Sequence, residues 1–357
     1  MSRPTRLVID TAALTQNLKR VESLAPGKAV IAMVKANAYG CGIEKVVPAL
    51  NQSVTAFGVA CLEEALRVKA LGIDREIILF QGVFQPAEFN LVSEQGFTVV
   101  LHHPQQLQWL INSPLPYPIK VWVKVNTGMN RLGFRIEDIA AVLSALRACR
   151  WIQHEISLMS HFACADEPNH PLNQQQISQF ESLMELNFTQ FSMANSAAIF
   201  NFPNCPGQIV RPGLMLYGSS PMADQTAAGL GLTAVLRFVS ALSAINQVAA
   251  GQSIGYGATL TLNRPSTIGI VAAGYGDGYP RHVKPGCSVW INGQLAPLVG
   301  RVSMDTLAVD LTDCQGYNLG DEVELWGDHL PVEQVASWAG TNSYELLCQI
   351  SERVRGI

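Results

Sequence analysis

The sequence predicts an α/β fold in two parts, an N-terminal (β/α)8 barrel of the TIM type followed by a mostly β domain. Two observations support this prediction. From residue 10 to about residue 217, short apolar runs that suit buried strands alternate with segments of helical periodicity. Beyond residue 230, short β-rich runs separated by glycine turns replace the helical periodicity. We therefore expect the barrel over residues 1–230 and the mostly β domain over residues 231–357, joined by the small, flexible stretch 223–231.

Eight apolar runs are the candidate strands of the barrel. Strands that alternate with helices imply a parallel sheet, and eight of them in roughly 210 residues fit the usual size of a (β/α)8 barrel. A doubly wound sheet is the alternative, but the glycine-rich dinucleotide turn that it usually carries is absent after the first strand. The candidate strands are residues 29–34, 56–60, 76–80, 97–101, 119–125, 155–160, 190–193 and 207–210.

Helices are expected between these strands. Asp10 and Thr11 can cap a first helix, on which Leu14, Leu18 and Val21 share one face. The other helical segments lie near residues 61–71, 86–95, 104–112, 136–147 and 173–186.

The second part is expected to be an antiparallel structure with short loops. The dipeptide Asn292-Gly293 is a strong signal for a hairpin turn. Two short helices near residues 331–339 and 343–352 should close the chain. The β-rich runs are residues 234–245, 267–272, 287–291, 305–311 and 321–326.

Composition excludes several classes of protein. Hydrophobic residues make up 48% of the 357 residues and charged residues only 15%, so the chain can bury a large core. The net charge is −4 and no run of like charges occurs, which argues against nucleic-acid binding and polybasic membrane contact. The eight cysteines include no C-x-x-C pair and therefore indicate reduced thiols, with no disulfide framework and no metal site. No signal peptide or membrane-spanning stretch is recognisable, so we expect a cytoplasmic protein.

Lys35 ends the first buried run, within the string VKANAYG at residues 34–40. The carboxyl end of a parallel strand is where ligands collect in α/β folds. A desolvated lysine there loses its preference for the ammonium form, and its free amine can then attack a carbonyl, as a Schiff-base lysine must. The alternative is a surface lysine that caps a strand, which position alone would favour.

Polar side chains also follow the later strands, and on a barrel all of them would share one face. The loops after strands seven and eight commonly bind phosphate, and Ser196 with the N–H groups of Gly213 and Leu214 would suit an anion. A helix N-cap and a Pro-Gly turn are the structural alternative. The strings involved are Lys124 with NTGMNRLGF at 126–134, MSHF at 159–162, MANSAA at 193–198 and RPGLMLYG at 211–218.

These strings resemble the alanine racemases, pyridoxal-phosphate enzymes with a barrel followed by a β domain, and the resemblance covers nearly the whole chain. It implies that Lys35 holds pyridoxal 5′-phosphate as a Schiff base and that Arg211 bonds the pyridine nitrogen. A guanidinium is effectively always protonated and cannot give its proton to that nitrogen, so the ring stays a weaker electron sink, which suits racemisation better than transamination. The other implied cofactor ligands are Tyr39, His161, Asn195, Ser196, Gly213, Leu214 and Tyr344.

The resemblance also implies a second base. The string SIGYGATL at 253–260 resembles the tyrosine-base segment of the family, so Tyr256 would act on the face of the Schiff base opposite Lys35. Taken alone, Tyr256 would be a turn tyrosine between glycines. An Arg211–His161 relay is implied as one influence on this base.

Two further strings complete the match. AAGYGDGYPR at 272–281 would place Tyr275 at the substrate entrance. VGRVSMD at 299–305 resembles the substrate-carboxylate loop, in which the backbone N–H of Met304 acts together with Arg131. In the family these β-domain residues reach the barrel of the other subunit in a head-to-tail homodimer.

The chain departs from the commonest family strings at Cys41, Asn126 and Asn130, where histidine, aspartate, and glycine or histidine are frequent. None of these would transfer a proton. Lys124 matches a lysine that the family often carries as a carbamate, which would give Arg131 an anionic partner.

The implied reaction is the interconversion of L- and D-alanine by a two-base mechanism, for peptidoglycan synthesis or alanine catabolism. A barrel decarboxylase of the same cofactor class is one alternative, although such enzymes use an acid at the pyridine nitrogen. A non-catalytic cofactor-binding barrel is the other, but such proteins end near the end of the first domain.

Overall fold

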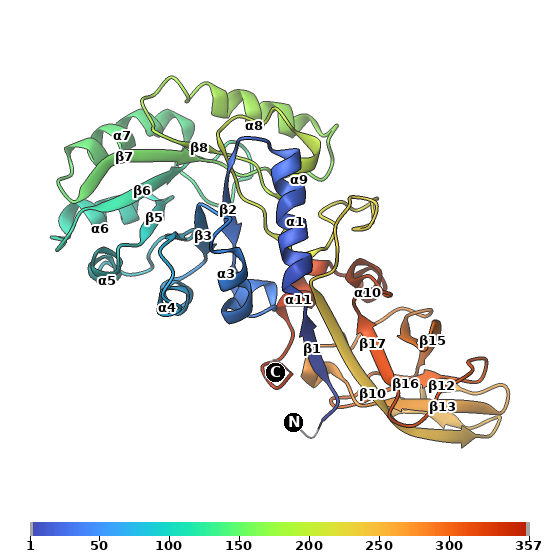
Figure 1. Ribbon diagram of the computed structural model, residues 1–357. Coiled ribbons are helices and arrows are strands. Elements are labelled where there is room, and N and C mark those ends of the chain that lie inside the picture. Colours follow the sequence, from blue (N-terminus) through green and yellow to red (C-terminus); the bar gives the residue numbers. More distant parts are fainter. Residues whose placement is uncertain (1–2, 355–357) are drawn as a thin grey trace.

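The computed structural model describes residues 3–354, and the predicted fold class is confirmed. Parallel strands β2 to β9 close into a barrel in sequence order (Figure 1). The closing pair sets Ala29 of β2 opposite Ile209 of β9. Residues of β3 and β5 are buried throughout, as expected of strands covered on both faces. The strands are β2 Ala29–Met33, β3 Ala56–Val59, β4 Glu76–Leu79, β5 Thr98–Leu101, β6 Ile119–Lys124, β7 Ile152–Met159, β8 Phe191–Ser192 and β9 Ile209–Val210.

Helices surround the barrel close to the predicted positions. The Asp10 side chain caps α1, as predicted, by accepting hydrogen bonds from the N–H groups of Ala12 and Ala13. Helix α3 was not among the predicted helices; it contains Pro48, a residue that disfavours a helix interior. The helices are α1 Thr11–Leu24, α3 Ile43–Leu50, α4 Leu62–Ala70, α5 Glu88–Gln95, α6 Pro104–Asn112, α7 Ile139–Ala148, α8 Pro171–Glu181 and α9 Ser196–Asn201.

The second part is built on a seven-stranded antiparallel sheet in the order β1-β10-β13-β16-β15-β14-β17. Asn292 and Gly293 join β14 to β15 with φ angles of 44° and 86°, as the predicted hairpin turn requires. The strands are β1 Arg6–Ile9, β10 Leu236–Val248, β13 Ser266–Val271, β14 Ser288–Ile291, β15 Gln294–Val299, β16 Leu307–Asp310 and β17 Glu322–Trp326, and helices α10 Val332–Ala339 and α11 Ser343–Cys348 follow them.

Strand β1 ties the two parts together. It pairs antiparallel with β10, with Leu7 opposite Phe238, although it precedes the barrel in sequence. In Figure 1 it lies along β10, and α1 then carries the chain to the barrel. The range 1–230 therefore contains one strand of the second part's sheet. Within residues 3–354, no helix has the length and apolar character that crossing a bilayer requires.

Candidate functional site

Lys35 stands at the carboxyl end of β2, in the mouth of the barrel. The β2 strand ends with Met33 N–H bonded to the Pro212 carbonyl and Val34 N–H bonded to the Gly58 carbonyl. The next segment, α2 (Lys35–Tyr39), is a left-handed turn, because residues 36–39 have φ angles of 52°, 54°, 54° and 51°. Such angles are unfavourable for residues that carry a Cβ, so the surroundings must hold this turn in place.

Side chains from α4 and the turn itself hold this conformation. The Glu64 carboxylate accepts hydrogen bonds from the N–H groups of Ala36 (2.6 Å) and Ala60 (2.8 Å). The Asn37 side-chain oxygen accepts from the Ile43 N–H and from Arg67. The Glu64 carboxylate and the Asn37 side-chain oxygen therefore stabilise the turn, and no local sequence motif predicts these hydrogen bonds.

Gly40 completes the turn with φ of 83°. A Cβ at this position would lie 2.1 Å from the carbonyl oxygen of Leu347 in α11. Only glycine allows this close approach, which packs the C-terminal helix against the segment that carries Lys35.

Two amines in the barrel mouth have lowered pKa values. The pKa of Lys35 is lowered first by burial among the surrounding residues and then by the charge of Arg131, while Cys348 and Glu64 oppose the shift. Lys124, at the end of β6, is only 8% exposed, and burial together with Arg211, Arg131 and Lys35 lowers its pKa to about 7. In a single chain Lys35 is also accessible to solvent.

Arg131 lies on the loop after β6, which folds back on the strand. Phe134 N–H donates to the Lys124 carbonyl, and Asn126 N–H donates to the Phe134 carbonyl. The Asn126 side-chain oxygen accepts from the N–H groups of Gly128 and Asn130, and Asn130 takes a left-handed φ of 58°. Asparagine tolerates that angle, so the two unusual asparagines form a turn that presents Arg131.

Arg211 follows β9 and is buried. Its guanidinium donates to Ser192 Oγ (2.5 Å), to the Ser160 carbonyl (2.6 Å) and to the Met193 carbonyl (3.2 Å), and it lies 3.3 Å from His161 Nδ1. Burial lowers its pKa to about 10, so it stays protonated at neutral pH. Burial and the nearby Arg211 lower the pKa of His161 well below its ordinary value, so the imidazole is neutral there.

A cluster of hydrogen-bonding groups that could serve as a cradle for an anion lies on the loops after β8 and β9. Ser196 Oγ accepts from Gly213 N–H at 2.9 Å, and a Cβ on Gly213 would lie 2.3 Å from Tyr39 Oη. The hydroxyl, the phenol and the glycine backbone therefore meet at one point, where Leu214 opens the short helix η2 (Leu214–Tyr217). Asn195 instead caps α9, accepting from Ala198 N–H.

Aromatic stacking fixes Tyr39 in this cradle. Its ring stacks on Tyr217 with centroids 4.6 Å apart, and it lies 6.0 Å from the ring of Tyr344. Tyr217 in turn donates to the Met33 carbonyl at 2.7 Å, two residues before Lys35. Burial raises the pKa of Tyr39 and raises that of Tyr344 to about 12, so both phenols stay protonated and can donate to an anion.

The remaining predicted residues lie together on the second part. Tyr256, in η3 (Tyr256–Ala258), is 73% exposed, and a cavity of about 500 Å³ joins it to Arg301 and Ser303. Tyr275 N–H donates to the Ser303 carbonyl, next to Met304, which is 53% exposed. Within residues 3–354 of one chain, no hydrogen bond, ion pair or ring contact joins Tyr256 to the barrel.

Comparison with known families settles what kind of chain this is. The N-terminal domain model of the alanine racemases matches residues 9–221, and their C-terminal domain model matches residues 235–357. The chain belongs to the alanine racemase family. It is accordingly an isomerase.

Individual alanine racemases match along nearly their full length. The alanine racemase of Legionella pneumophila (strain Corby) is 59% identical over 355 residues, which are 99% of each chain. The crystal structure of the biosynthetic alanine racemase from Pseudomonas aeruginosa has a TM-score of 0.96 at 44% identity and covers 99% of this chain and 98% of its own. The Bartonella henselae alanine racemase, whose crystal structure has covalently bound pyridoxal phosphate, has a TM-score of 0.89 at 30% identity, covering 99% of this chain and 98% of its own.

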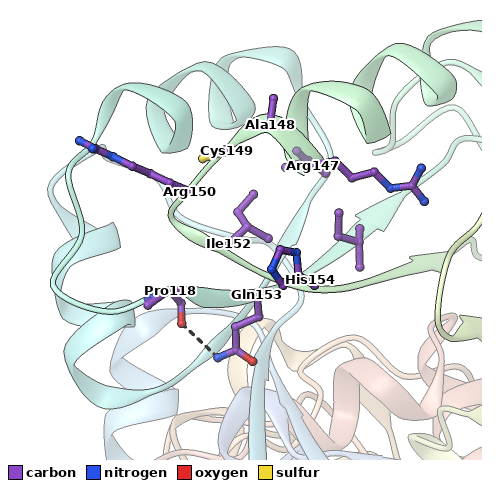
Figure 2. Close-up of a pocket in the computed structure, with 10 residues that line it drawn as sticks. Pro118, Arg147, Ala148, Cys149, Arg150, Ile152, Gln153 and His154 are labelled. Carbon is purple, nitrogen blue, oxygen red and sulfur yellow. Dashed lines mark hydrogen bonds between the residues drawn. The ribbon is translucent and has the colours of Figure 1, made fainter.

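A separate cavity of about 550 Å³ lies at the opposite end of the barrel from the candidate site. It is formed where α7 ends and β7 begins and includes Arg147, Arg150 and His154. In Figure 2 the guanidinium groups of Arg147 and Arg150 point away from each other, so they do not form a joint anion site. Catalytic residues of barrels lie at the carboxyl ends of the strands, and this cavity lies at the amino ends.

Glu64 and Tyr217 support the candidate site around Lys35 but were not predicted from the sequence. Both act on backbone groups far from them in sequence, as Glu64 does on Ala36 N–H and Tyr217 on the Met33 carbonyl. The helical periodicity around Glu64 gave no signal for this contact. Tyr217 lies in the quoted string after β9, but its partner could not be inferred from the string.

Proposed function

We propose that the enzyme interconverts L- and D-alanine with pyridoxal 5′-phosphate by a two-base mechanism, with Lys35 and Tyr256 as the bases. The observation that carries the proposal is the amine of Lys35, whose pKa is lowered in a barrel mouth that also holds a cradle for an anion. An amine and a phosphate site in one barrel mouth are the two groups that the cofactor needs.

The residues present fit the cofactor. Lys35 would hold its aldehyde carbon. Its phosphate would take the hydroxyls of Tyr39 and Tyr344, Ser196 Oγ and the N–H groups of Gly213 and Leu214. The donor set suits a dianion, because the two phenols stay protonated, and a side chain on Gly213 would fill the cradle.

Arg211 would meet the pyridine nitrogen as a donor. Its other contacts, to the Ser160 and Met193 carbonyls, hold the guanidinium in one orientation. When bound, the cofactor withdraws electrons from the substrate Cα and so acidifies its C–H bond. A protonated arginine beside a neutral His161 offers the ring no transferable proton at neutral pH, which favours return of the proton to Cα.

The two bases would then exchange protons with Cα from opposite faces. Lys35 Nζ takes the Cα proton of D-alanine while Tyr256 Oη supplies one to form L-alanine, and the reverse reaction exchanges these roles. Arg131 and the Met304 N–H would bind the substrate carboxylate, with Tyr275 at the entrance. Asn195 would support the cofactor through α9, which it caps.

A head-to-tail homodimer would bring these groups together. Tyr256 is 73% exposed and Met304 is 53% exposed, and neither contacts the barrel residues described within one chain. The second part of one subunit would therefore complete the barrel site of the other. We place this enzyme in the cytoplasm, where D-alanine would serve peptidoglycan synthesis or alanine would be catabolised.

Deuterium incorporation tests the exchange at Cα, and two variants test the two bases. In D₂O, the wild-type enzyme should exchange the Cα hydrogen of both enantiomers and racemise each. Lys35→Ala should lose the absorbance of the covalently held cofactor together with racemisation. Tyr256→Phe should keep that absorbance while its racemisation falls by about 10²–10⁴-fold, the usual worth of a general acid–base group. A Tyr256→Phe enzyme with wild-type turnover would refute the second base.

A further inference from the structure

A buried carboxylate organises the surface beside Met304. Asp277, in η4 (Tyr275–Asp277), is 0% exposed. It accepts from both terminal nitrogens of Arg3 (3.0 and 3.1 Å), from Arg353 Nε (2.7 Å) and from the Gly274 N–H (2.9 Å). Two arginines from opposite ends of the chain therefore neutralise one buried charge, as a charge in such a place requires.

The same two guanidinium groups also hold the loop that contains Met304. Arg353 donates to the Met304 carbonyl (3.2 Å) and pairs with the Asp305 carboxylate (2.9 Å), and Arg3 donates to the Asp305 carbonyl (3.2 Å). Two backbone hydrogen bonds from η4 also hold the loop. Tyr275 N–H donates to the Ser303 carbonyl (3.0 Å), and Gly276 N–H donates to the Met304 carbonyl (2.9 Å).

These contacts fix the direction of the Met304 N–H group. The Ser303 carbonyl points toward η4, where Tyr275 binds it. Because the peptide between Ser303 and Met304 is trans, its N–H points the opposite way, away from η4. A backbone N–H group, unlike a side chain, has no rotamers through which it could reorient. Its direction therefore depends on the groups that hold the loop.

We propose that Arg353, Asp277 and Arg3 are positioning residues that aim the Met304 N–H at the substrate carboxylate. The inference rests on the proposed role of Met304 and adds residues that never touch the substrate. Close packing supports it, because a Cβ on Gly276 would lie 2.7 Å from an Arg353 nitrogen and 3.0 Å from the Met304 carbonyl oxygen. The loop has little room to move while Arg353 is in place.

The test measures carboxylate binding separately from turnover in the holoenzyme. The variants are Arg353→Met and Arg353→Lys, and the probes are L-alanine in steady state and propionate, which is alanine without its amino group, by calorimetric titration. Arg353→Met should raise the KM and the propionate Kd about tenfold, the worth of one charge-assisted hydrogen bond, with kcat within about twofold. Arg353→Lys should restore part of the lost affinity for L-alanine and propionate, because lysine supplies a cation but not the bidentate geometry of a guanidinium.

Arg264 provides a matched control. It forms an ion pair of the same kind with Asp313 on the second part of the chain, but the pair is exposed and has no contact with residues 303–305. Arg264→Met should leave both constants at wild-type values. An equal effect of Arg264→Met and Arg353→Met would overturn the inference, because general loosening of the sheet would then be the cause.

Two further variants keep the test decisive. If Arg353→Met fails to fold, Asp305→Asn, which removes only the exposed partner of Arg353, should raise the propionate Kd severalfold, and wild-type binding would overturn the inference. Arg131→Met distinguishes the proposed carboxylate site from the positioning role of Arg353. Weaker binding in Arg131→Met with wild-type binding in Arg353→Met refutes the positioning role alone, whereas wild-type binding in both refutes the carboxylate site itself.

Discussion

Lys124 is surrounded by cations in the site. Burial and the charges of Arg211, Arg131 and Lys35 lower its pKa to about 7, and no anion is among the causes of that shift. Near neutral pH a large share of the amine is therefore uncharged and nucleophilic. Reaction with CO2 forms an N–C bond and releases one proton, which leaves a carbamate anion among three cations.

We expect a carbamate on Lys124 that balances Arg131. Enzyme equilibrated with ¹³C-bicarbonate should show a carbamate carbon resonance that Lys124→Ala lacks. The variant should also have a KM for alanine raised about tenfold, because Arg131 loses a charged partner. Unchanged activity and substrate affinity in Lys124→Ala would contradict this expectation.

At the residue scale, the sequence was informative wherever a side chain follows a barrel strand. The alternation of strands and helices alone places Lys124 at the end of β6 and Lys35, His161 and Arg211 shortly after β2, β7 and β9. The residues that contact these four side chains could not be predicted from the alternation. Ser192, which binds Arg211, is the last residue of β8, and its orientation depends on the register of the closed barrel.

At the element scale, the left-handed turn after Lys35 shows where sequence reasoning fails. Alanine disfavours positive φ, so the string at residues 36–39 gives no warning of four such residues in a row. Tertiary contacts override this preference, and Glu64 supplies two of them by accepting from Ala36 N–H and Ala60 N–H. Local strain of this kind persists only where the surroundings hold it.

Substitution of Glu64 should release this turn. Glu64→Gln replaces a charged acceptor of two N–H groups by a neutral amide, so the Kd for pyridoxal phosphate should rise about tenfold and the melting temperature of the apoenzyme should fall. Glu63→Gln is the matched control, because Glu63 lies beside it in the first turn of α4 with an exposed carboxylate. Equal cofactor affinity in the two variants would show that the turn does not depend on Glu64.

At the scale of the whole molecule, local pattern predicts the barrel better than it predicts the sheet. Parallel strands of a (β/α)8 barrel pair in sequence order, so finding the strands gives the topology. The antiparallel sheet pairs distant segments, as in Leu7 of β1 with Phe238 of β10, and short β-rich runs do not specify such partners. Only the hairpin at Asn292-Gly293 had a local signal.

The stability of that sheet should depend on pH through Glu324 of β17. Its side chain is buried, with the residue 2% exposed, and burial alone would raise its pKa. Hydrogen bonds from Leu330 N–H (2.9 Å), His329 N–H (2.8 Å) and Arg237 Nε (3.2 Å) outweigh burial and hold the pKa below the ordinary 4.5. The folded protein thus binds fewer protons than the unfolded chain as the pH falls below about 4.5.

This stabilising contribution is fully present above pH 4.5 and is lost as the pH falls through the lowered pKa of the folded state. Glu324→Gln should therefore lose about 1–3 kcal/mol of unfolding free energy at pH 7 and show a flatter decline toward acid. Urea unfolding between pH 7 and pH 3 measures both effects. Glu185→Gln, which changes an exposed carboxylate on the barrel, should keep the wild-type curve. If the Glu324→Gln and wild-type curves stayed parallel down to pH 3, some other carboxylate would have to govern the acid limb.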